Sequence, residues 1–386
     1  MMAQEAAHRA RMRGKVRDWL TDRALPLWAT AGVDREAGGF AERLTWSGAP
    51  DLDAAKRVRV QARQIYVFAH AGMLGLHPDG VAIAEQGYNF LMRHACPDGA
   101  AAGFVHALDR AGGIVDARCD SYDHAFLLFA FSWFYRATRR TDVLLAIEGV
   151  LAAIDARLAL PDDSGSVAVD HRMGPDRLQN PHMHLFEGLL AAAGATGQQR
   201  FLDRADRLAD LFRTRMFDPE TGVLREYYDA QWRPAAGEQG QIVEPGHHCE
   251  WTWLLKRHAG SGPLSDEAWR LADFVERHGR PNGGVLLCDE LRVDGSVRSA
   301  STRSWPQTEA LKAEIALAEA RGIPLGPRAE AIVEALFDRF LDRPVAGGWV
   351  DWTDAEGAPL VTAIPASTLY HVFLAFSEYL GAADPT

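Results

Sequence analysis

One short segment combines the residue types that proton-transfer chemistry needs. Residues 245–251 read Pro-Gly-His-His-Cys-Glu-Trp, and an apolar run follows. The Pro-Gly pair predicts a turn that leads into a helix, on which His247 and Glu250 would share one face. A carboxylate beside an imidazole orients the ring and favours its charged form, which suits a general acid or base. A helix start with a capping acid and a partly buried histidine explains the same residues equally well.

Polar residues also interrupt other apolar helical stretches. Arg59 stands within residues 57–64, and an arginine that faces a cavity binds hydroxyl or carbonyl oxygens through a rigid donor fork. We interpret its neighbours Arg57 and Arg63 as part of a charged helix surface. Trp305 precedes another helix start and offers an indole face on which a sugar ring stacks. His371 lies in a further helix start, predicted from Pro365, in the last part of the chain.

Two more segments contain histidines whose direction the sequence leaves open. In Tyr122-Asp123-His124, Asp123 fits a helix N-cap, while Tyr122 and His124 either face a cavity or pack. His182 and His184 follow Asn180-Pro181, a good helix start. Residues two positions apart do not share a helix face, so at most one of these two histidines points into a pocket.

A glycine turn followed by a short extended stretch recurs along the chain. Glycines of these turns fall at positions 39, 103, 165, 222, 284 and 348, with spacings of 64, 62, 57, 62 and 64. Each turn predicts a short hairpin, and long helical patterns separate the hairpins. The predicted helices are residues 13–28, 58–74, 81–94, 123–136, 143–158, 181–193, 201–216, 251–256, 266–278, 308–319, 329–340 and 365–379.

Two helices in each of six repeats predict an all-α fold. Because strands and helices do not alternate, a parallel sheet is excluded. Six helical hairpins form either an open superhelix or a closed ring, and their aromatic residues favour closure around a cavity. We therefore predict an (α/α)6 barrel, a toroid of about twelve helices with short β-hairpins at one end, that spans residues 1–386 as a single domain.

Composition restricts the class of partner. The formal net charge of −11 argues against nucleic acid, and no apolar run has the length of a membrane span. The first residues do not resemble a signal peptide. Four cysteines without metal-binding spacing fit free thiols in a reducing compartment, so we expect a cytoplasmic protein. They are Cys96, Cys119, Cys249 and Cys288.

The ordered set of these motifs resembles the N-acylglucosamine 2-epimerase superfamily over essentially the whole chain. The motifs are residues 57–64, 122–126, 180–184, 245–251, 305–309 and 367–371. The resemblance implies an (α/α)6 barrel with a pocket that holds no metal and no cofactor, and a monosaccharide substrate bound by a monomer or homodimer. It implies that the pocket is lined by Arg59, Tyr122, Asn180, His184, His247, Glu250, Trp305 and His371.

The resemblance implies proton transfer next to a sugar carbonyl, through a cis-enediolate whose charge Arg59 and the imidazoles would stabilise. We expect an aldose–ketose isomerase of the mannose-to-fructose type; the alternative is a 2-epimerase of mannose or glucose, N-acylglucosamine or cellobiose. A phosphorylated or sulfonated hexose stays open, although no lysine cluster is present to hold its anion. A glycoside hydrolase would need two carboxylates across the scissile bond, for which Asp123, Glu250 and Glu309 are candidates. A sugar-binding scaffold would explain none of the histidines at helix starts.

The two histidines of the expected reaction differ in their neighbours. Glu250 is expected to hold His247 and favour its charged form, which suits ring opening. His371 has Leu374 rather than a carboxylate three positions later, so it is expected to stay neutral and remove the C2 proton. His247 and Glu250 could also bind a metal together with His184 and His371, but we predict a reaction without one.

Overall fold

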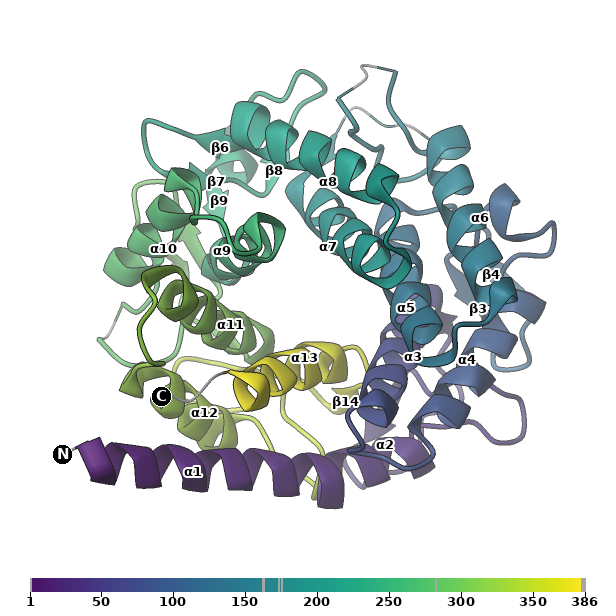
Figure 1. Ribbon diagram of the computed structural model, residues 1–386, viewed down its shortest axis with the longest axis horizontal. Coiled ribbons are helices and arrows are strands. Elements are labelled where there is room, and N and C mark those ends of the chain that lie inside the picture. The colour runs from purple at the N-terminus through teal and green to yellow at the C-terminus, as the bar shows by residue number, and fades with distance from the viewer. Residues whose placement is uncertain (1, 162–163, 173, 175, 282, 383–386) are drawn as a thin grey trace.

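Six helices form the inner ring of a closed toroid (Figure 1). The structure is a computed structural model and describes residues 2–161, 164–172, 174, 176–281 and 283–382. Each inner helix packs against the next, and the last packs against the first, which closes the ring. The inner helices are α3 (Val58–Met73), α5 (Ser121–Thr138), α7 (Gln179–Thr196), α9 (Pro245–Ala259), α11 (Ser304–Arg321) and α13 (Thr368–Gly381).

A second layer of helices surrounds this ring. The first of them begins as α1 (Met2–Trp19) and passes through a π-helical turn, Leu20–Ala24, into α2 (Leu25–Thr30). The others are α4 (Gly80–His94), α6 (Thr141–Arg157), α8 (Gln199–Leu211, followed by the π-helical turn Phe212–Met216), α10 (Asp266–His278) and α12 (Pro327–Arg339). The predicted (α/α)6 barrel is confirmed.

The two layers differ in sequence because they differ in what they contact. On the outer helix α8, the buried residues Phe201, Ala205 and Leu208 recur at helical spacing, and the opposite face is solvated. The inner helix α5 is buried on nearly all sides, because outer helices and neighbouring inner helices both cover it. The hydrophobic core therefore lies between the two layers. It also joins the first repeat to the last, where Trp28 stacks on Trp349 with ring centroids 4.9 Å apart.

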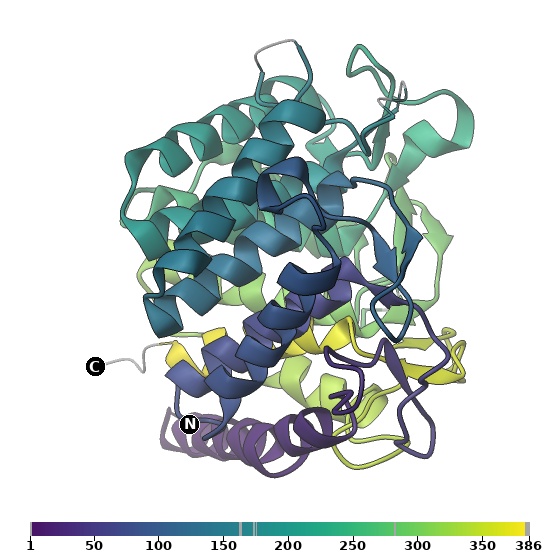
Figure 2. The same ribbon diagram turned by 90° about the vertical axis from the view of Figure 1, so that its right-hand side faces the viewer.

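Short antiparallel strands gather at one end of the barrel (Figure 2). Three hairpins lie where glycine turns predict them: β3–β4, β6–β7 and β10–β11. The strands are β1 (Arg43–Thr45), β2 (Lys56–Arg57), β3 (Ala107–Leu108), β4 (Ile114–Asp116), β5 (Arg177–Leu178), β6 (Phe217–Asp218), β7 (Val223–Leu224), β8 (Tyr227–Tyr228), β9 (Ile242–Val243), β10 (Glu290–Arg292), β11 (Val297–Ser299), β12 (Thr302–Arg303), β13 (Trp352–Thr353) and β14 (Ala363–Pro365).

The prediction of one separate hairpin in each repeat is only partly right. Ladders also join neighbouring repeats, as in β2–β3, β5–β8, β9–β10 and β12–β13, and β1–β14 joins the first repeat to the last. Strands of two or three residues are too short to be stable as isolated hairpins, so they gain by pairing across repeats. The start of α13 also differs from the prediction, because Pro365 pairs with Arg43 in β14 and the helix begins at Thr368.

Five inner helices hold the hairpin end through one repeated contact. A polar side chain in the first turns of each helix accepts the backbone N–H of the residue that follows a glycine turn or its equivalent. The pairs are Gln61 with Phe40, His124 with Phe104, His182 with Val167, His248 with Leu224 and Gln307 with Leu287, at 2.7–3.0 Å. We call these five side chains the turn clamps. They fix the hairpins over the helix N-termini, where the predicted site residues lie.

No helix among the described residues combines the length and the apolar character that crossing a membrane requires.

Candidate active site

All eight predicted site residues lie at the hairpin end of the inner helices. Each stands in the first or second turn of its helix, so six helix N-termini bring them around one axis. Arg59 is on α3, Tyr122 on α5, Asn180 and His184 on α7, His247 and Glu250 on α9, Trp305 on α11 and His371 on α13.

The indole of Trp305 lies between the two histidines that were expected to transfer protons. Its ring centroid is 4.8 Å from that of His247 and 5.7 Å from that of His371. Gly246, the second residue of α9, makes room for this ring, because a Cβ atom there would lie 2.6 Å from Trp305 Cζ3. The Pro-Gly pair is thus part of the first helical turn, with Pro245 as the first residue of α9, and not a turn before the helix.

His247 is held by carboxylates other than the one that the sequence suggested. Its Nδ1–H donates to Glu226 Oε2 at 2.9 Å, and Glu244 Oε2 is 3.6 Å away. Burial alone would lower the pKa of His247, but the charges of Glu226 and Glu244 raise it to about 10. The charge of Glu250 also favours the charged form of His247, as expected, but Glu226 rather than Glu250 holds the ring by a hydrogen bond.

His371 also has a carboxylate partner, contrary to the prediction. Its Nδ1 lies 2.9 Å from Glu309 Oε1, on the neighbouring helix α11. Burial, together with the positive charges of Arg63 and Lys312, nevertheless holds the pKa of His371 well below its ordinary value of 6.5. The neutral ring donates Nδ1–H to Glu309 and leaves the Nε2 lone pair free to accept a proton. These surroundings favour the neutral form of His371, as expected, but the cause is burial and nearby positive charge rather than the lack of a carboxylate partner.

Glu250 lies deeper in the barrel, between His184 and the α11 carboxylate. Its Oε1 atom is 3.9 Å from His184 Nδ1, and neither of its oxygens has a hydrogen-bond partner among the described residues. Burial and the negative charge of Glu309 raise the pKa of Glu250 well above its ordinary value. These surroundings therefore favour the protonated form of Glu250 more than in an exposed carboxyl group.

A second carboxylate orients His184. The Nδ1 atom of His184 lies 3.1 Å from Glu187 Oε2, and the Tyr370 hydroxyl donates to Glu187 at 2.6 Å. Burial lowers the pKa of His184 to about 4, so this imidazole is neutral. Its ring packs 4.5 Å from Phe126 and 5.0 Å from Tyr122. His184 thus presents a fixed tautomer to the same space as Tyr122.

The interpretation of Arg63 as surface is wrong. Only 6% of Arg63 is exposed, and its Nη2 donates to the Tyr122 hydroxyl at 2.8 Å. Its guanidinium lies 4.1 Å from the Phe126 ring centroid and makes no ion pair with the described residues. Arg57 lies in strand β2 rather than on a helix surface; it is half-buried, pairs with Glu42 and lines the same cavity as Arg63. Arg63 therefore brings an uncompensated positive charge to the centre of the ring.

Arg59 occupies the rim. Its side chain is 23% exposed and forms no hydrogen bond with the part of the chain that the structure describes; its ion pair there is with Asp123 Oδ1 at 3.7 Å. Arg59 lines a cavity of about 440 Å³ together with Tyr122, Asn180 and Arg63. The amide oxygen of Asn180 is buried there without a partner among the described residues. His247, Trp305 and His371 do not line this cavity, which forms one side of the site.

Asp123 is not the N-cap of α5. That role belongs to Asp120, whose side chain accepts the N–H of Asp123 at 3.1 Å. Asp123 is fully buried and accepts from His106 Nδ1 at 2.6 Å. Burial raises the pKa of Asp123 to about 6. Asp123 is therefore already engaged, which weighs against a role as a hydrolytic carboxylate.

Three histidines of the motif segments, His124, His182 and His248, are turn clamps. His124 and His182 each donate from Nδ1 to a carbonyl one helical turn earlier and accept an N–H at Nε2. His248 accepts in the same way. Burial lowers the pKa of His124 and of His248 to about 4, which keeps these acceptors neutral. In each doublet one histidine therefore holds a hairpin, and its neighbour, His184 or His247, faces the centre.

Positions counted along each helix from its turn clamp identify site residues that the sequence motifs did not indicate. The position two residues after each clamp is Arg63, Phe126, His184, Glu250 or Glu309, and the position five residues after is Tyr66, Phe129, Glu187, Trp253 or Lys312. Most of these side chains point into the ring and form its deep polar layer. Glu226 has no such signal, because it lies in a loop between strands β7 and β8.

Several groups of side chains have the composition of a metal site. Among the described residues, three potential ligand atoms lie within 4.8 Å of one another in four groups. In each group at least one carboxylate already binds a positive charge or an imidazole N–H, as Glu309 binds Lys312 at 2.6 Å. The groups are His106–Asp120–Asp123, His184–Glu187–Glu250, Glu226–Glu244–His247 and Glu250–Glu309–His371.

Comparison with known proteins agrees with this arrangement. The family model described as N-acylglucosamine 2-epimerase matches residues 38–375. A mannose-6-phosphate isomerase of Rhizobium meliloti (strain 1021) is 38% identical over 95% of this chain and 96% of its own length. A D-mannose isomerase of Thermobifida fusca is 29% identical over 82% of this chain and 80% of its own.

A solved structure of another sugar-converting enzyme has the same fold. The structure of a cellobiose 2-epimerase from Spirochaeta thermophila superposes with a TM-score of 0.85 over 97% of both chains, at 22% identity. The chain is thus a sugar isomerase or 2-epimerase. Its ring of six helix pairs and its match over residues 38–375 place it in the N-acylglucosamine 2-epimerase family.

Proposed function

We propose that this chain is an aldose–ketose isomerase that interconverts a mannose-type hexose and the corresponding 2-ketose. The observation that carries the proposal is the opposite protonation of the two histidines beside Trp305. His371 is a neutral base next to Arg63 and Lys312, while His247 is a charged acid between Glu226 and Glu244. A general acid and a general base on the same substrate are what ring opening and proton abstraction require.

The chemistry follows from this pair. The sugar stacks on the Trp305 indole. His247 donates a proton to the ring oxygen as its bond to C1 breaks and, now neutral, takes the proton of the C1 hydroxyl, so that the open-chain aldehyde forms and His247 is charged again. His371 Nε2 then takes the C2 proton, and the electrons of the C–H bond form the enediolate. The guanidinium of Arg63 stabilises the developing negative charge, because it is buried and forms no ion pair with a carboxylate of the described residues. His371 returns the proton to C1, the proton of the C2 hydroxyl passes to the oxygen on C1, and the ketose results.

The alternative is a 2-epimerase that uses the same residues. Epimerisation needs a second base on the opposite face of C2, which would take the proton from the product epimer. His247 is the candidate for that base, but Glu226 and Glu244 favour its charged form, which cannot accept a proton. This asymmetry favours isomerisation. The names of the two sequence relatives, mannose-6-phosphate isomerase and D-mannose isomerase, point the same way.

Sugar chromatography after incubation with mannose, fructose and glucose tests the proposal. Fructose formed from mannose supports an isomerase, and glucose formed from mannose without fructose supports the epimerase. If none of the mono- and disaccharides offered is converted, the result would instead support a sugar-binding protein. The proposal involves no metal and no cofactor, and it treats the chain as one catalytic domain.

A phosphorylated hexose is a second candidate substrate, and Arg59 favours it. The donor at the rim of the site is not a lysine cluster but the guanidinium fork of Arg59, which forms no hydrogen bond with the described residues. Such a fork binds phosphate oxygens in a bidentate manner. The ratio of kcat/KM for mannose 6-phosphate to that for mannose tests this candidate in the wild type and in Arg59→Gln. A ratio below one, unchanged by the substitution, excludes it.

A further inference from the structure

Lys312 places a fully buried ammonium group beside the proposed base. It lies on α11 one turn after Glu309, and none of its surface is exposed. Its Nζ is 2.6 Å from Glu309 Oε2 and 4.0 Å from the centroid of the Trp253 ring. The mechanism above gives this lysine no step, yet burying a charge costs several kcal/mol unless the site compensates it.

Three buried carboxyl groups compensate the charge. Burial would lower the pKa of Lys312, but Glu309, Glu250 and Glu187 raise it above its ordinary value, so the amine stays protonated. The Trp253 ring covers the ammonium through a cation–π contact, which is strongest where water is excluded.

Glu309 connects this ammonium to His371. Its Oε2 binds Lys312, while its Oε1 lies 2.9 Å from His371 Nδ1. The carboxylate alone would favour a charged imidazole and would raise the pKa of His371. The ammonium on the other side of the same carboxylate opposes that effect. The pair therefore fixes the ring through a hydrogen bond without charging it.

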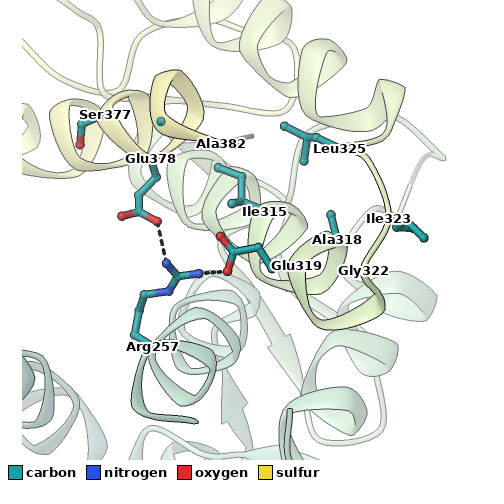
Figure 3. A pocket seen from close by; sticks show the side chains of 11 residues that line it. Arg257, Ile315, Ala318, Glu319, Gly322, Ile323, Leu325, Ser377, Glu378 and Ala382 are labelled. Atoms are coloured by element: carbon teal, nitrogen blue, oxygen red, sulfur yellow. Dashed lines mark hydrogen bonds and ion pairs between the residues drawn. The ribbon is translucent and has the colours of Figure 1, made fainter. Parts of the chain in front are cut away.

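The far end of the barrel anchors Trp253. Its indole N–H donates to Glu378 at 3.1 Å, and Arg257 joins Glu378 and Glu319 at a cavity of about 440 Å³ (Figure 3). This cavity lies at the C-terminal ends of α9, α11 and α13, opposite the catalytic residues at their N-termini. It carries no catalytic group of the proposed reaction, and its ion pairs help to hold the ring that covers Lys312.

We propose that Lys312 is a positioning residue that keeps His371 available as the base: it holds Glu309 in the orientation that accepts His371 Nδ1–H, and its charge opposes protonation of the ring. The proposal rests on the isomerase function, because it presumes that His371 removes the C2 proton. The charged and titratable groups that face His371 are Glu309 and Lys312 on α11, Arg63 on α3, His184 and Glu187 on α7, Glu250 and His247 on α9, and Tyr370 on its own helix.

The test is the pH dependence of kcat and kcat/KM for Lys312→Met, which removes the charge and keeps most of the volume. The acid limb is expected to move up by at least about one pH unit, because Glu309 then favours the charged imidazole without opposition. Activity at high pH should largely recover. A folded Lys312→Met enzyme with the acid limb of the wild type would overturn the proposal.

Two further variants separate this effect from a loss of structure. Lys56→Met removes another buried lysine, which pairs with Asp34 at 3.1 Å rather than with Glu309, and should leave the acid limb unchanged. Glu309→Gln keeps the ammonium but removes the carboxylate, so its acid limb should stay or move down. An upward move in Glu309→Gln contradicts the proposal even where Lys312→Met fails to fold. If His371→Asn retains wild-type exchange of the C2 proton, the assignment of the base fails instead.

Discussion

The Nδ1 atom of His247 lies 2.9 Å from Glu226 Oε2, a carboxylate that precedes it by 21 positions and lies outside its helix. Glu250, which shares the helix face of His247 in the sequence, has no hydrogen bond to it. A carboxylate in the loop between two short strands therefore favours the charged form of His247, the proposed acid. The hairpin end of the barrel thus influences the protonation of the site.

Glu226→Gln should move the alkaline limb of the pH–rate profile to lower pH. The charged imidazole has a pKa of about 10 because Glu226 and Glu244 favour it, so removal of one carboxylate lowers that pKa. The measurement is kcat/KM between pH 7 and 11, in roughly half-unit steps. As a control, Glu238→Gln changes an exposed carboxylate between β8 and β9 that pairs with Arg292, and it should keep the wild-type limb.

The same pair predicts how stability changes with pH. The folded pKa of His247 lies above its ordinary value of 6.5, so its stabilising contribution is complete below pH 6.5 and is lost as the pH rises to about 10. Urea unfolding should show a wild-type free energy that falls across this window. The fall should be smaller in Glu226→Gln, and an equal fall in both proteins would contradict the assignment.

His371→Asn and His247→Asn should each lose roughly 10²–10⁴-fold in kcat, the usual cost of a missing general acid or base. His371→Asn should also lose exchange of the C2 proton with deuterium from solvent, measured by NMR of the sugar. His258→Asn is the matched control, because its imidazole is partly exposed and pairs with Asp206 on the outside of the ring. Wild-type exchange in His371→Asn would mean that another residue is the base.

His124→Ala should destabilise the fold by about 1–3 kcal/mol, because the buried N–H of Phe104 loses its acceptor. Chemical denaturation measures the loss. Since His124 is a turn clamp and not a reacting group, kcat under conditions where the variant is folded should stay near that of the wild type. A large loss of kcat without a loss of stability would place His124 in the chemistry.

Gly246→Ala should displace the Trp305 ring, since the added Cβ would lie 2.6 Å from Cζ3. Misplacement of about 1 Å at a binding surface can reduce the rate by roughly 10²-fold. We expect a higher KM and a lower kcat, together with a changed tryptophan fluorescence on sugar binding. Gly194→Ala on the inner helix α7 adds the same atom into open space and should leave both constants unchanged.

Treatment with EDTA should leave the activity unchanged. The proposed steps use imidazoles, Arg63 and carboxyl groups, and Lys312 occupies one of the carboxylates that a cation would need. The measurement is turnover after prolonged chelation and dialysis, with and without added divalent ions. Complete loss of activity, restored by one of these ions, would contradict a metal-free reaction.

The repeats, the helices and the candidate histidines could all be predicted from the sequence. The glycine spacing and the helical periodicity predicted the (α/α)6 barrel, because both are local properties of a chain that repeats one unit. Local spacing also limited the doublet His182 and His184 to one inward side chain, since helix geometry separates positions i and i+2.

Which groups surround each histidine depends on the tertiary structure and could not be predicted from local spacing. Glu226 reaches His247 from a loop, Glu309 reaches His371 from the neighbouring helix, and Arg63 is buried only because the ring closes against Phe126 and α13. Helical periodicity relates residues on one helix, whereas these contacts join different repeats. The charge of an imidazole depends on its burial and on every charge nearby, so the roles of His247 and His371 follow from the assembled ring rather than from the residues next to them in sequence.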